Sequence, residues 1–395
     1  MSIRRTALAV PGSQPCLYRL LPAILILLLA GSLFSCGGKK IPAFGSGQTA
    51  YVTLPSMGSV LQLRIDSLTG AMTPGALTPQ VAGTSPFGLA LLSNTYLYVG
   101  NSTANTISIF SIASDGNLSQ NATPVPSGGS GPHAVVIDPS GKFLLVTNSF
   151  SNNIAVFSIN TSTGALSQVS GSPFYANDDP GEILMPASGD LVYITNTGVG
   201  TVTAFTFSTS TGALTPVPGS PYYSGPGASG LAVESIGSGT YLYVANSSAV
   251  NPGSTSVGNI SAFSVNTTAG ASYGALSPLT GSPFTSVAGS APAALVIDPN
   301  NKFLFATTPG GSYSVWCYLI NTANGQLTAA LNSPFSVAAG GLFALIDPNG
   351  SFFYIGSPSG IQGYTYNQND GQPSVINNSP FSTDATVPGN MVIVP

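Results

Sequence analysis

An all-β fold, a seven-bladed β-propeller with four antiparallel strands in each blade, is predicted by three observations. One hairpin turn recurs along the chain, strand-like apolar segments fill the intervals between its copies, and the C-terminal segment repeats the start of an internal unit. The turn glycines are Gly70, Gly116, Gly164, Gly212, Gly274, Gly325 and Gly371. They recur at intervals of about 50 residues, a period typical of propeller blades.

The unit around Gly164 shows the expected strands in order. Strands are predicted at residues 133–137, 142–148, 153–159 and 165–169. The first strand is apolar without alternation, which indicates burial on both faces between neighbouring blades. An Asp-Pro-Ser-Gly turn follows it, with Pro and Gly in places that favour turns. A Gly-Ser-Pro-Phe segment at 171–174 leads to the next unit, and this segment also recurs.

The two ends of the repeat region predict how the ring closes. Only two strands, 50–54 and 59–65, precede Gly70, so the first blade lacks an inner strand. Residues 388–395 align position for position with residues 132–139, where another unit has its inner strand. We therefore expect the C-terminal strand to complete the first blade and to protect the strand edges.

The N-terminal segment predicts export. Arg4, Arg5 and Arg19 precede an apolar run at residues 20–34, as in a secretory signal. The alternative interpretation is a transmembrane helix. The run contains Pro22 and is shorter than the ~20 residues that span a bilayer, which favours the signal.

The end of this segment predicts a lipid anchor. The sequence Leu33-Phe34-Ser35-Cys36-Gly37 resembles the lipobox of bacterial lipoproteins, and the resemblance implies that the Cys36 thiol receives a diacylglycerol. We expect a signal peptide at 1–35, a lipidated linker at 36–47 and the propeller at 48–395. Because Gly37 is not aspartate, the same resemblance points to the outer membrane of the cell envelope, on its periplasmic or surface face.

Composition excludes one class of partner. Five Lys and Arg (eight less Arg4, Arg5 and Arg19) follow Cys36, against twelve Asp and Glu. Nucleic-acid binding needs many cations to neutralise phosphates, so we expect none here. The cysteines add no disulfide, because Cys16 would leave with the signal, Cys36 would be lipidated and Cys317 stands alone. The strand-like surroundings of Cys317 favour a buried side chain.

Three residues depart from the repeat and are the candidate catalytic groups. His133, the only histidine, begins an inner strand, where imidazole can act as a general base. Glu182 stands where other units have small or apolar residues, and Asp179 precedes it in the same loop as Asp178. We expect His133, Glu182 and Asp179 to gather at one mouth of the channel. The alternative is that His133 is an ordinary repeat residue and the acids a solvated loop.

Residues 131–148, from Gly131-Pro132-His133 to Val146-Thr147-Asn148, resemble the repeat of seven-bladed lactonase-like propellers. This group includes phosphogluconolactonase-type cycloisomerases and bacterial surface proteins with a Tyr-Val-Thr-Asn motif. The resemblance covers about residues 48–395. It implies the propeller fold and places His133 in the region where family members hold active-site groups, but one fold hosts many functions.

Several motifs are absent from the sequence. A phosphorylated sugar lactone would need a basic clamp, yet Arg64 is the only arginine in the domain, and Lys142 and Lys302 occupy turns expected on the face opposite His133. There is no Gly-x-Ser-x-Gly elbow, Cys-x-x-Cys pair, histidine-rich metal set or phosphate loop. We expect no cofactor and no metal.

Two functions follow from this pattern. The first is a lipid-anchored binding module rather than an enzyme, its polar rim and the loop insertion at 247–258 contacting a protein or a neutral glycan. The alternative is a hydrolase that opens an uncharged lactone, using His133 with Glu182 or Asp179. The low charge of the chain favours the first.

Overall fold

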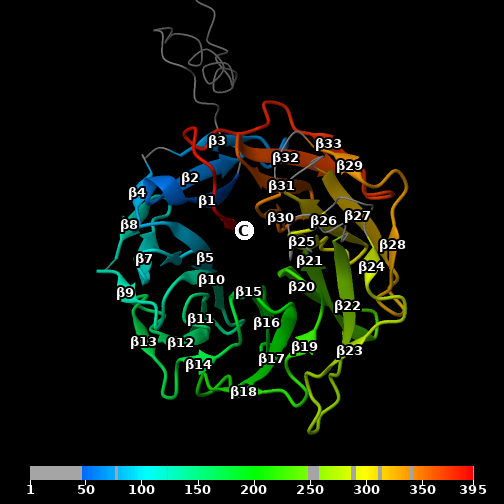
Figure 1. The fold of residues 1–395 in the computed structure, drawn as a ribbon. Coiled ribbons are helices and arrows are strands. Elements are labelled where there is room, and N and C mark those ends of the chain that lie inside the picture. Colours follow the sequence, from blue (N-terminus) through cyan, green and yellow to red (C-terminus); the bar gives the residue numbers. More distant parts are fainter. Residues whose placement is uncertain are drawn as a thin grey trace, which may run out of the picture. The chain divides into compact units, whose positions relative to one another are not determined.

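The computed structural model describes residues 47–75, 79–121, 123–247, 258–285, 291–309, 314–337 and 341–394. Within these ranges strands make seven antiparallel sheets around a central opening, and the only helical segment is a short 3-10 turn, η1 (Pro55–Met57) (Figure 1). The predicted seven-bladed propeller is thereby confirmed. Blades are numbered one to seven in the order of their hairpin glycines.

Each blade runs from an inner strand at the central opening to an outer strand at the rim. The inner strands of blades one to seven are β34 (Met391–Val394), β5 (Pro86–Leu92), β10 (Pro132–Ile137), β15 (Pro180–Leu184), β20 (Ala228–Ile236), β25 (Ala294–Ile297) and β30 (Ala344–Ile346). The second strands are β1 (Gln48–Leu54), β6 (Tyr96–Asn101), β11 (Phe143–Asn148), β16 (Leu191–Asn196), β21 (Gly239–Asn246), β26 (Phe303–Thr308) and β31 (Phe352–Ser357). The third strands are β2 (Ser59–Ile65), β7 (Thr106–Ile112), β12 (Asn153–Ile159), β17 (Thr201–Phe207), β22 (Asn259–Val265), β27 (Ser314–Ile320) and β32 (Gly360–Tyr366).

The outer strand is divided into two short pieces, a detail beyond the predicted four strands. Its first pieces are β3 (Met72–Pro74), β8 (Leu118–Gln120), β13 (Leu166–Gln168), β18 (Leu214–Pro216), β23 (Leu276–Pro278), β28 (Leu327–Ala329) and β33 (Pro373–Val375). Its second pieces are β4 (Gln80–Val81), β9 (Val125–Pro126), β14 (Phe174–Tyr175), β19 (Tyr222–Tyr223), β24 (Phe284–Thr285) and β29 (Phe335–Ser336). In blade seven a single bridge, Ile361 to Phe381, stands in place of the second piece.

In blades three to seven a recurring Ser-Pro-Phe or Ser-Pro-Tyr segment accompanies the break in the outer strand, whereas blades one and two are divided without it. Between the two outer pieces the third strand loses its backbone partner, and the serine hydroxyl replaces it. Ser172 accepts a bond from the Val156 amide at 2.8 Å. The same bond joins Ser220 to Ala204, Ser282 to Ala262, Ser333 to Cys317 and Ser379 to Gly363.

The ring closes as predicted. β34 pairs with β1 in antiparallel register, from Thr49 opposite Val394 to Val52 opposite Met391. The first and last strands of the described chain therefore share one blade, which leaves the inner edge of β1 covered.

Apolar side chains fill the space between blades. One cluster of buried residues joins Leu145 and Val156 of blade three to Ile183, Val192 and Phe205 of blade four. Other clusters join the remaining neighbours in the same way. The inner strands are thus covered on both faces, as their uninterrupted apolar sequence predicts.

A buried hydrogen bond ties the second strand of most blades to the hairpin of the next. Tyr193 of blade four donates its hydroxyl to the carbonyl of Gly274 at 2.9 Å. Equivalent bonds run from Tyr51 to Gly116, Tyr98 to Gly164, Tyr243 to Gly325 and Tyr354 to Gly70. Burial raises the pKa of these phenols, so they remain protonated donors. Leu145 and Phe305 occupy the tyrosine position in blades three and six.

The repeated aspartates are structural, as expected. Asp138 is buried in the turn between β10 and β11, and one carboxylate oxygen accepts the amides of Lys142 and Phe143 at 2.8 and 2.6 Å. Asp298 and Asp347 bind the same two positions in blades six and seven. These carboxylates cap turns and are not available for catalysis.

We expect Tyr193→Phe to lower the free energy of unfolding by about 1–2 kcal/mol, because the Gly274 carbonyl loses its buried donor. Urea unfolding followed by circular dichroism measures this change. Tyr223→Phe is the matched control, since Tyr223 is 68 % exposed and its substitution should have almost no effect. Equal effects of the two substitutions would contradict the role given to the buried bond.

Candidate active site at one mouth of the channel

The candidate residues lie at irregularities in the inner strands. In β10 the pairing with β11 shifts between Pro132 and Val135, so His133 stands in a bulge. In β15 the pairing shifts between Pro180 and Ile183, and Glu182 stands in the equivalent bulge. Bulges re-aim side chains and are frequent beside active sites.

Threonines of the second strands hold these bulges in shape. Thr147 accepts the amide of Ala134 at 3.0 Å and donates to the carbonyl of Gly181 in the next blade at 2.8 Å. Thr195 accepts the amide of Glu182 at 3.0 Å and donates to Ser229 of blade five at 3.0 Å. Thr195 therefore links the backbone of Glu182 to blade five, and Thr147 links the preceding Gly181 to blade three.

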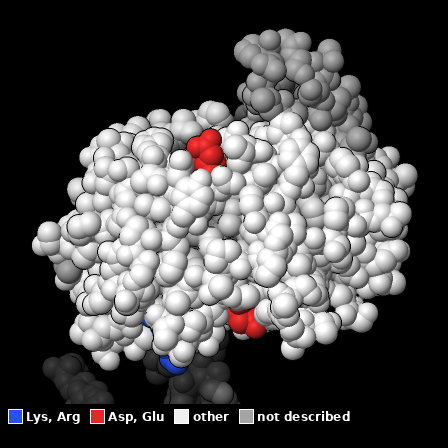
Figure 2. Space-filling model, turned by 60° about the horizontal axis from the view of Figure 1, so that its bottom comes forward, with Lys and Arg blue, Asp and Glu red and all other residues white. Residues whose placement is uncertain are grey.

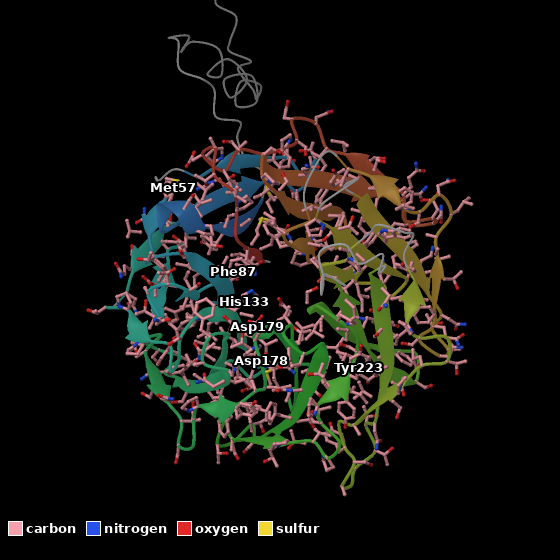
Figure 3. The ribbon with its side chains drawn as sticks, viewed as in Figure 1. Met57, Phe87, His133, Asp178, Asp179 and Tyr223 are labelled. Atoms are coloured by element: carbon pink, nitrogen blue, oxygen red, sulfur yellow. The ribbon has the colours of Figure 1, made fainter. Side chains whose placement is uncertain are left out.

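His133 is half-buried at the inner edge of the ring, between Phe87 and the strand of blade four (Figure 3). Its ring lies 4.8 Å from that of Phe87 between centroids, with the planes tilted by 35°. Burial lowers the pKa of His133, and a hydrogen bond with the Gly181 backbone and the nearby Asp179 carboxylate only partly offset this. The imidazole is therefore neutral at pH 7.

The protonation of the His133 ring depends on its neighbours. Interaction with the Gly181 backbone favours the protonated ring, as the Asp179 carboxylate does. Nδ1 is buried and has no hydrogen-bond partner within the described residues. Nδ1 is thus withdrawn from solvent.

Asp178 and Asp179 lie together in the loop before β15, on the same side of the ring as His133 (Figure 3). Asp179 has a left-handed backbone, φ +52°, which aspartate tolerates. Its amide donates to Asn152 Oδ1 at 3.0 Å and its carbonyl accepts from Thr197 at 3.0 Å. This clamp leaves the Asp179 side chain exposed beside His133, so these two predicted residues do come together.

Glu182 is half-buried in the channel wall of blade four. Burial raises its pKa to about 7, so its carboxyl is close to half protonated at neutral pH. Within the described part of the chain its carboxylate takes part in no hydrogen bond, and none joins it to His133. Asp179 thus lies near enough to His133 to act on its charge, and Glu182 stands on the same strand as Gly181, without a hydrogen bond to the imidazole.

Sequence reasoning missed Asn390 and Phe150. Asn390 occupies in blade one the position that Glu182 has in blade four, and alignment of the inner strands marks it as the other polar member of that row. Its Oδ1 accepts the amide of Met391 at 2.8 Å. Phe150, 79 % exposed, lies in the turn between β11 and β12, close to Gly131 at the start of the His133 strand. Only the exposure of Phe150 in the structure distinguishes it from a buried aromatic.

The basic side chains of the described propeller lie away from this mouth. Lys302 donates to the carbonyls of Gln368 and Asn369 in the hairpin of blade seven. Arg64 donates to the carbonyl of Asp115 in the hairpin of blade two at 3.1 Å. Lys142 stands in the turn after β10, at the end of that strand opposite His133. Figure 2 shows how sparse charged residues are on one side of the molecule.

Other candidate sites are weaker. Cys317 is buried, and burial raises the pKa of its thiol to about 12, so it is an inert core residue as expected. Two surface pockets of about 350 and 600 Å³ are lined by turns at the hairpin end of the blades, including Asp138 and Asn300 respectively. Neither is lined by His133 or Glu182.

Membrane attachment concerns a different part of the chain. Cys36, the predicted lipidation site, and the predicted signal peptide lie outside the described residues. Among the residues that are described, the structure has no apolar helix of sufficient length to cross a bilayer.

The chain belongs to the family described as lactonase, 7-bladed β-propeller, whose model matches residues 42–178 and 182–387. A 6-phosphogluconolactonase of Formosa agariphila is 41 % identical over 76 residues, which are 19 % of this chain and 22 % of that protein. The match therefore spans about a fifth of the curated relative.

Solved structures agree with the fold. The periplasmic gluconolactonase of Pseudomonas aeruginosa has a TM-score of 0.68 at 16 % identity, over 89 % of this chain and 99 % of that one. A protein of Bacteroides fragilis provisionally assigned as a 6-phosphogluconolactonase has a TM-score of 0.73 at 18 % identity, over 89 % and 98 %. The family match favours the alternative from the sequence, a lactonase-like hydrolase, over the binding module that the low charge suggested.

Because His133 is the only histidine, its titration can be followed directly by NMR in an untagged protein. We expect a midpoint below 6.5, since burial lowers the pKa. Asp179→Asn should lower the midpoint further by removing the carboxylate that raises it. Asp178→Asn is the control and should change it little. A wild-type midpoint above 6.5 would contradict the assigned environment.

Proposed function

We propose that the protein is a hydrolase that opens uncharged lactones at this mouth of the channel. The observation that carries the proposal is Glu182, a half-buried carboxyl whose pKa burial raises to about 7, held in a bulge of the inner strand next to the one that carries His133, in a lactonase-family propeller. A carboxyl with this pKa can accept and return a proton at neutral pH.

Charge supports a neutral substrate. Asp178, Asp179 and Glu182 lie at the mouth, and the described Lys and Arg side chains lie elsewhere. A phosphate group would meet carboxylates here instead of the basic clamp that phosphate recognition uses. The phosphorylated substrate implied by the name of the Formosa agariphila relative is therefore not the one that we propose.

In the proposed reaction Glu182 acts as general base. Its carboxylate takes a proton from a water molecule while the water oxygen attacks the lactone carbonyl carbon. The tetrahedral intermediate then collapses, the bond from carbon to ring oxygen breaks, and the proton held by Glu182 passes to that oxygen. One water and one lactone yield one hydroxy acid.

His133 is a positioning residue in this scheme. Its ring interacts with the backbone of Gly181, which precedes Glu182, and its buried Nδ1 has no access to water. The neutral ring therefore holds the Glu182 bulge and adds no positive charge that would lower the pKa of the base.

The test is hydrolysis of a panel of lactones, including δ-gluconolactone and its 6-phosphate. We expect turnover of the neutral lactone, with kcat/KM rising as pH increases through about 7, since the base must be deprotonated. Glu182→Gln should reduce kcat at least 100-fold. Glu234→Gln, a carboxyl bonded to the Ser235 amide in β20, is the matched control and should retain turnover.

His133→Ala separates the two roles. If His133 positions Glu182, the variant loses part of kcat, and its kcat/KM still rises with pH with a midpoint near 7. If kcat/KM of the variant no longer rises with pH, the general base is His133 instead. No turnover of any lactone in the panel, or preference for the phosphorylated one, would overturn the proposal.

We also propose that Cys36 is lipidated and anchors the protein in the cell envelope. The lipobox-like sequence supports this proposal. Cys36→Ser should move the protein from the membrane fraction to the soluble fraction, whereas Cys16→Ser, within the predicted signal, should not. Unchanged fractionation of Cys36→Ser would contradict lipidation.

A further inference from the structure

Three aromatic side chains are strongly exposed on the face that carries the candidate site. Phe150, Tyr175 and Tyr223 are 79, 72 and 68 % exposed. They are the aromatic members of the exposed large apolar residues in the described ranges. Exposed aromatic rings are unfavourable in water, and a group of them on one face marks a binding surface.

The fold places the three rings from the channel mouth to the rim. The β-carbon position of Gly131, two residues before His133, lies 2.8 Å from the ring of Phe150, so this ring covers the start of the inner strand. Tyr175 lies in β14, opposite Asn153 at the outer edge of blade three. Tyr223 occupies the same position of blade four, opposite Thr201, and lies nearer the rim than His133 does in Figure 3.

Comparison of the blades shows that these aromatics are not demanded by the fold. The second residue of the short outer strand is Tyr only in blades three and four. The same position holds Val81, Pro126, Thr285 and Ser336 in blades one, two, five and six. The two blades that carry these exposed tyrosines are also the blades that carry His133 and Glu182.

The surroundings of the rings are polar and lack cations. Asn152 donates to Asp178 Oδ1 at 3.2 Å, and the Ser151 hydroxyl accepts the amide of Ser130 at 2.9 Å. The described Lys and Arg side chains lie at the hairpin end of the blades. Separated flat rings among uncharged and acidic groups fit a ligand with apolar ring faces and hydroxyl edges, and they exclude an anionic polymer.

We propose that Phe150, Tyr175 and Tyr223 form a binding surface for a neutral oligosaccharide, whose sugar rings stack on the three side chains. Together with the proposed lactonase function, this surface also suggests the substrate, a lactone at the end of an oligosaccharide. This assignment of the substrate rests on the proposed function. The terminal lactone lies at the mouth beside Glu182, and the following sugars extend over blades three and four. The binding step itself does not depend on hydrolysis.

The test is titration calorimetry of the full chain with cellohexaose, maltohexaose and xylohexaose, and with hexagalacturonate as the charged comparison. We expect saturable binding of at least one neutral hexasaccharide and none of hexagalacturonate. The double variant Tyr175→Ala and Tyr223→Ala should weaken binding at least tenfold. Replacing the same two residues by Phe keeps the rings and should preserve affinity. Leu331→Ala, at an exposed apolar residue of the outer edge, is the control for general surface changes.

Failure of this inference is distinguishable from failure of the proposed function. Binding of no neutral hexasaccharide, or binding that the double Ala variant leaves unchanged, overturns the inference, whether or not δ-gluconolactone is hydrolysed. Saturable binding lost in the double Ala variant supports it even if no lactone is turned over. If the double variant instead converts an oligomer to a monomer in light scattering, the surface is a contact between copies and the inference is overturned.

Discussion

The geometry of the ring depends on the hydrogen bond from a second-strand tyrosine to the hairpin glycine of the next blade. Apolar packing between blades is non-directional and allows neighbouring sheets to slide. The bond from Tyr193 to Gly274, and the four like it, fixes where one blade stands against the next at the hairpin end. The left-handed turn glycine, whose carbonyl accepts the bond, therefore has a role in assembly as well as in the turn.

Two junctions lack this bond, and one of them contains the candidate site. Leu145 stands in place of tyrosine between blades three and four, so packing of Phe143 against the Gly212 turn replaces a polar contact. At the opposite end of this junction the bond from Thr147 to Gly181 supplies the directional contact. The position of Glu182 relative to His133 thus depends on that threonine, close to the chemistry, and not on a tyrosine at the far end.

The fold was predictable because the repeat states it many times. Turn glycines, Asp-Pro turns and Ser-Pro-Phe segments each recur, and the structure shows hydrogen bonds that explain their recurrence. Asp138 accepts the amide of Lys142, and Ser172 accepts the amide of Val156. The missing inner strand of blade one and the matching segment at 388–395 predicted ring closure for the same reason. The structural role of these recurring residues was predictable because comparison of several blades shows which residues recur.

The site was predictable only in part, because its residues are departures that occur once. His133, Glu182 and Asp179 were recognisable as exceptions, but sequence could not show that His133 and Glu182 each stand in a β-bulge. It also could not show that the ring of His133 is turned toward Gly181, since this follows from burial and from packing on Phe87. Exposed and buried aromatics look alike in sequence, which is why Phe150 and the outer tyrosines emerged only from their accessibility.

The closure of blade one by β1 and β34 also bears on how freely the chain order can be rearranged. Because Thr49 and Val394 are paired neighbours, a short connection across them would join the ends of the described fold without disturbing any other blade. New ends opened in another connection between blades would give a circular permutant with the same seven sheets. In such a permutant the strands of blade one would be continuous in sequence. The new chain ends would lie at the connection chosen for cutting.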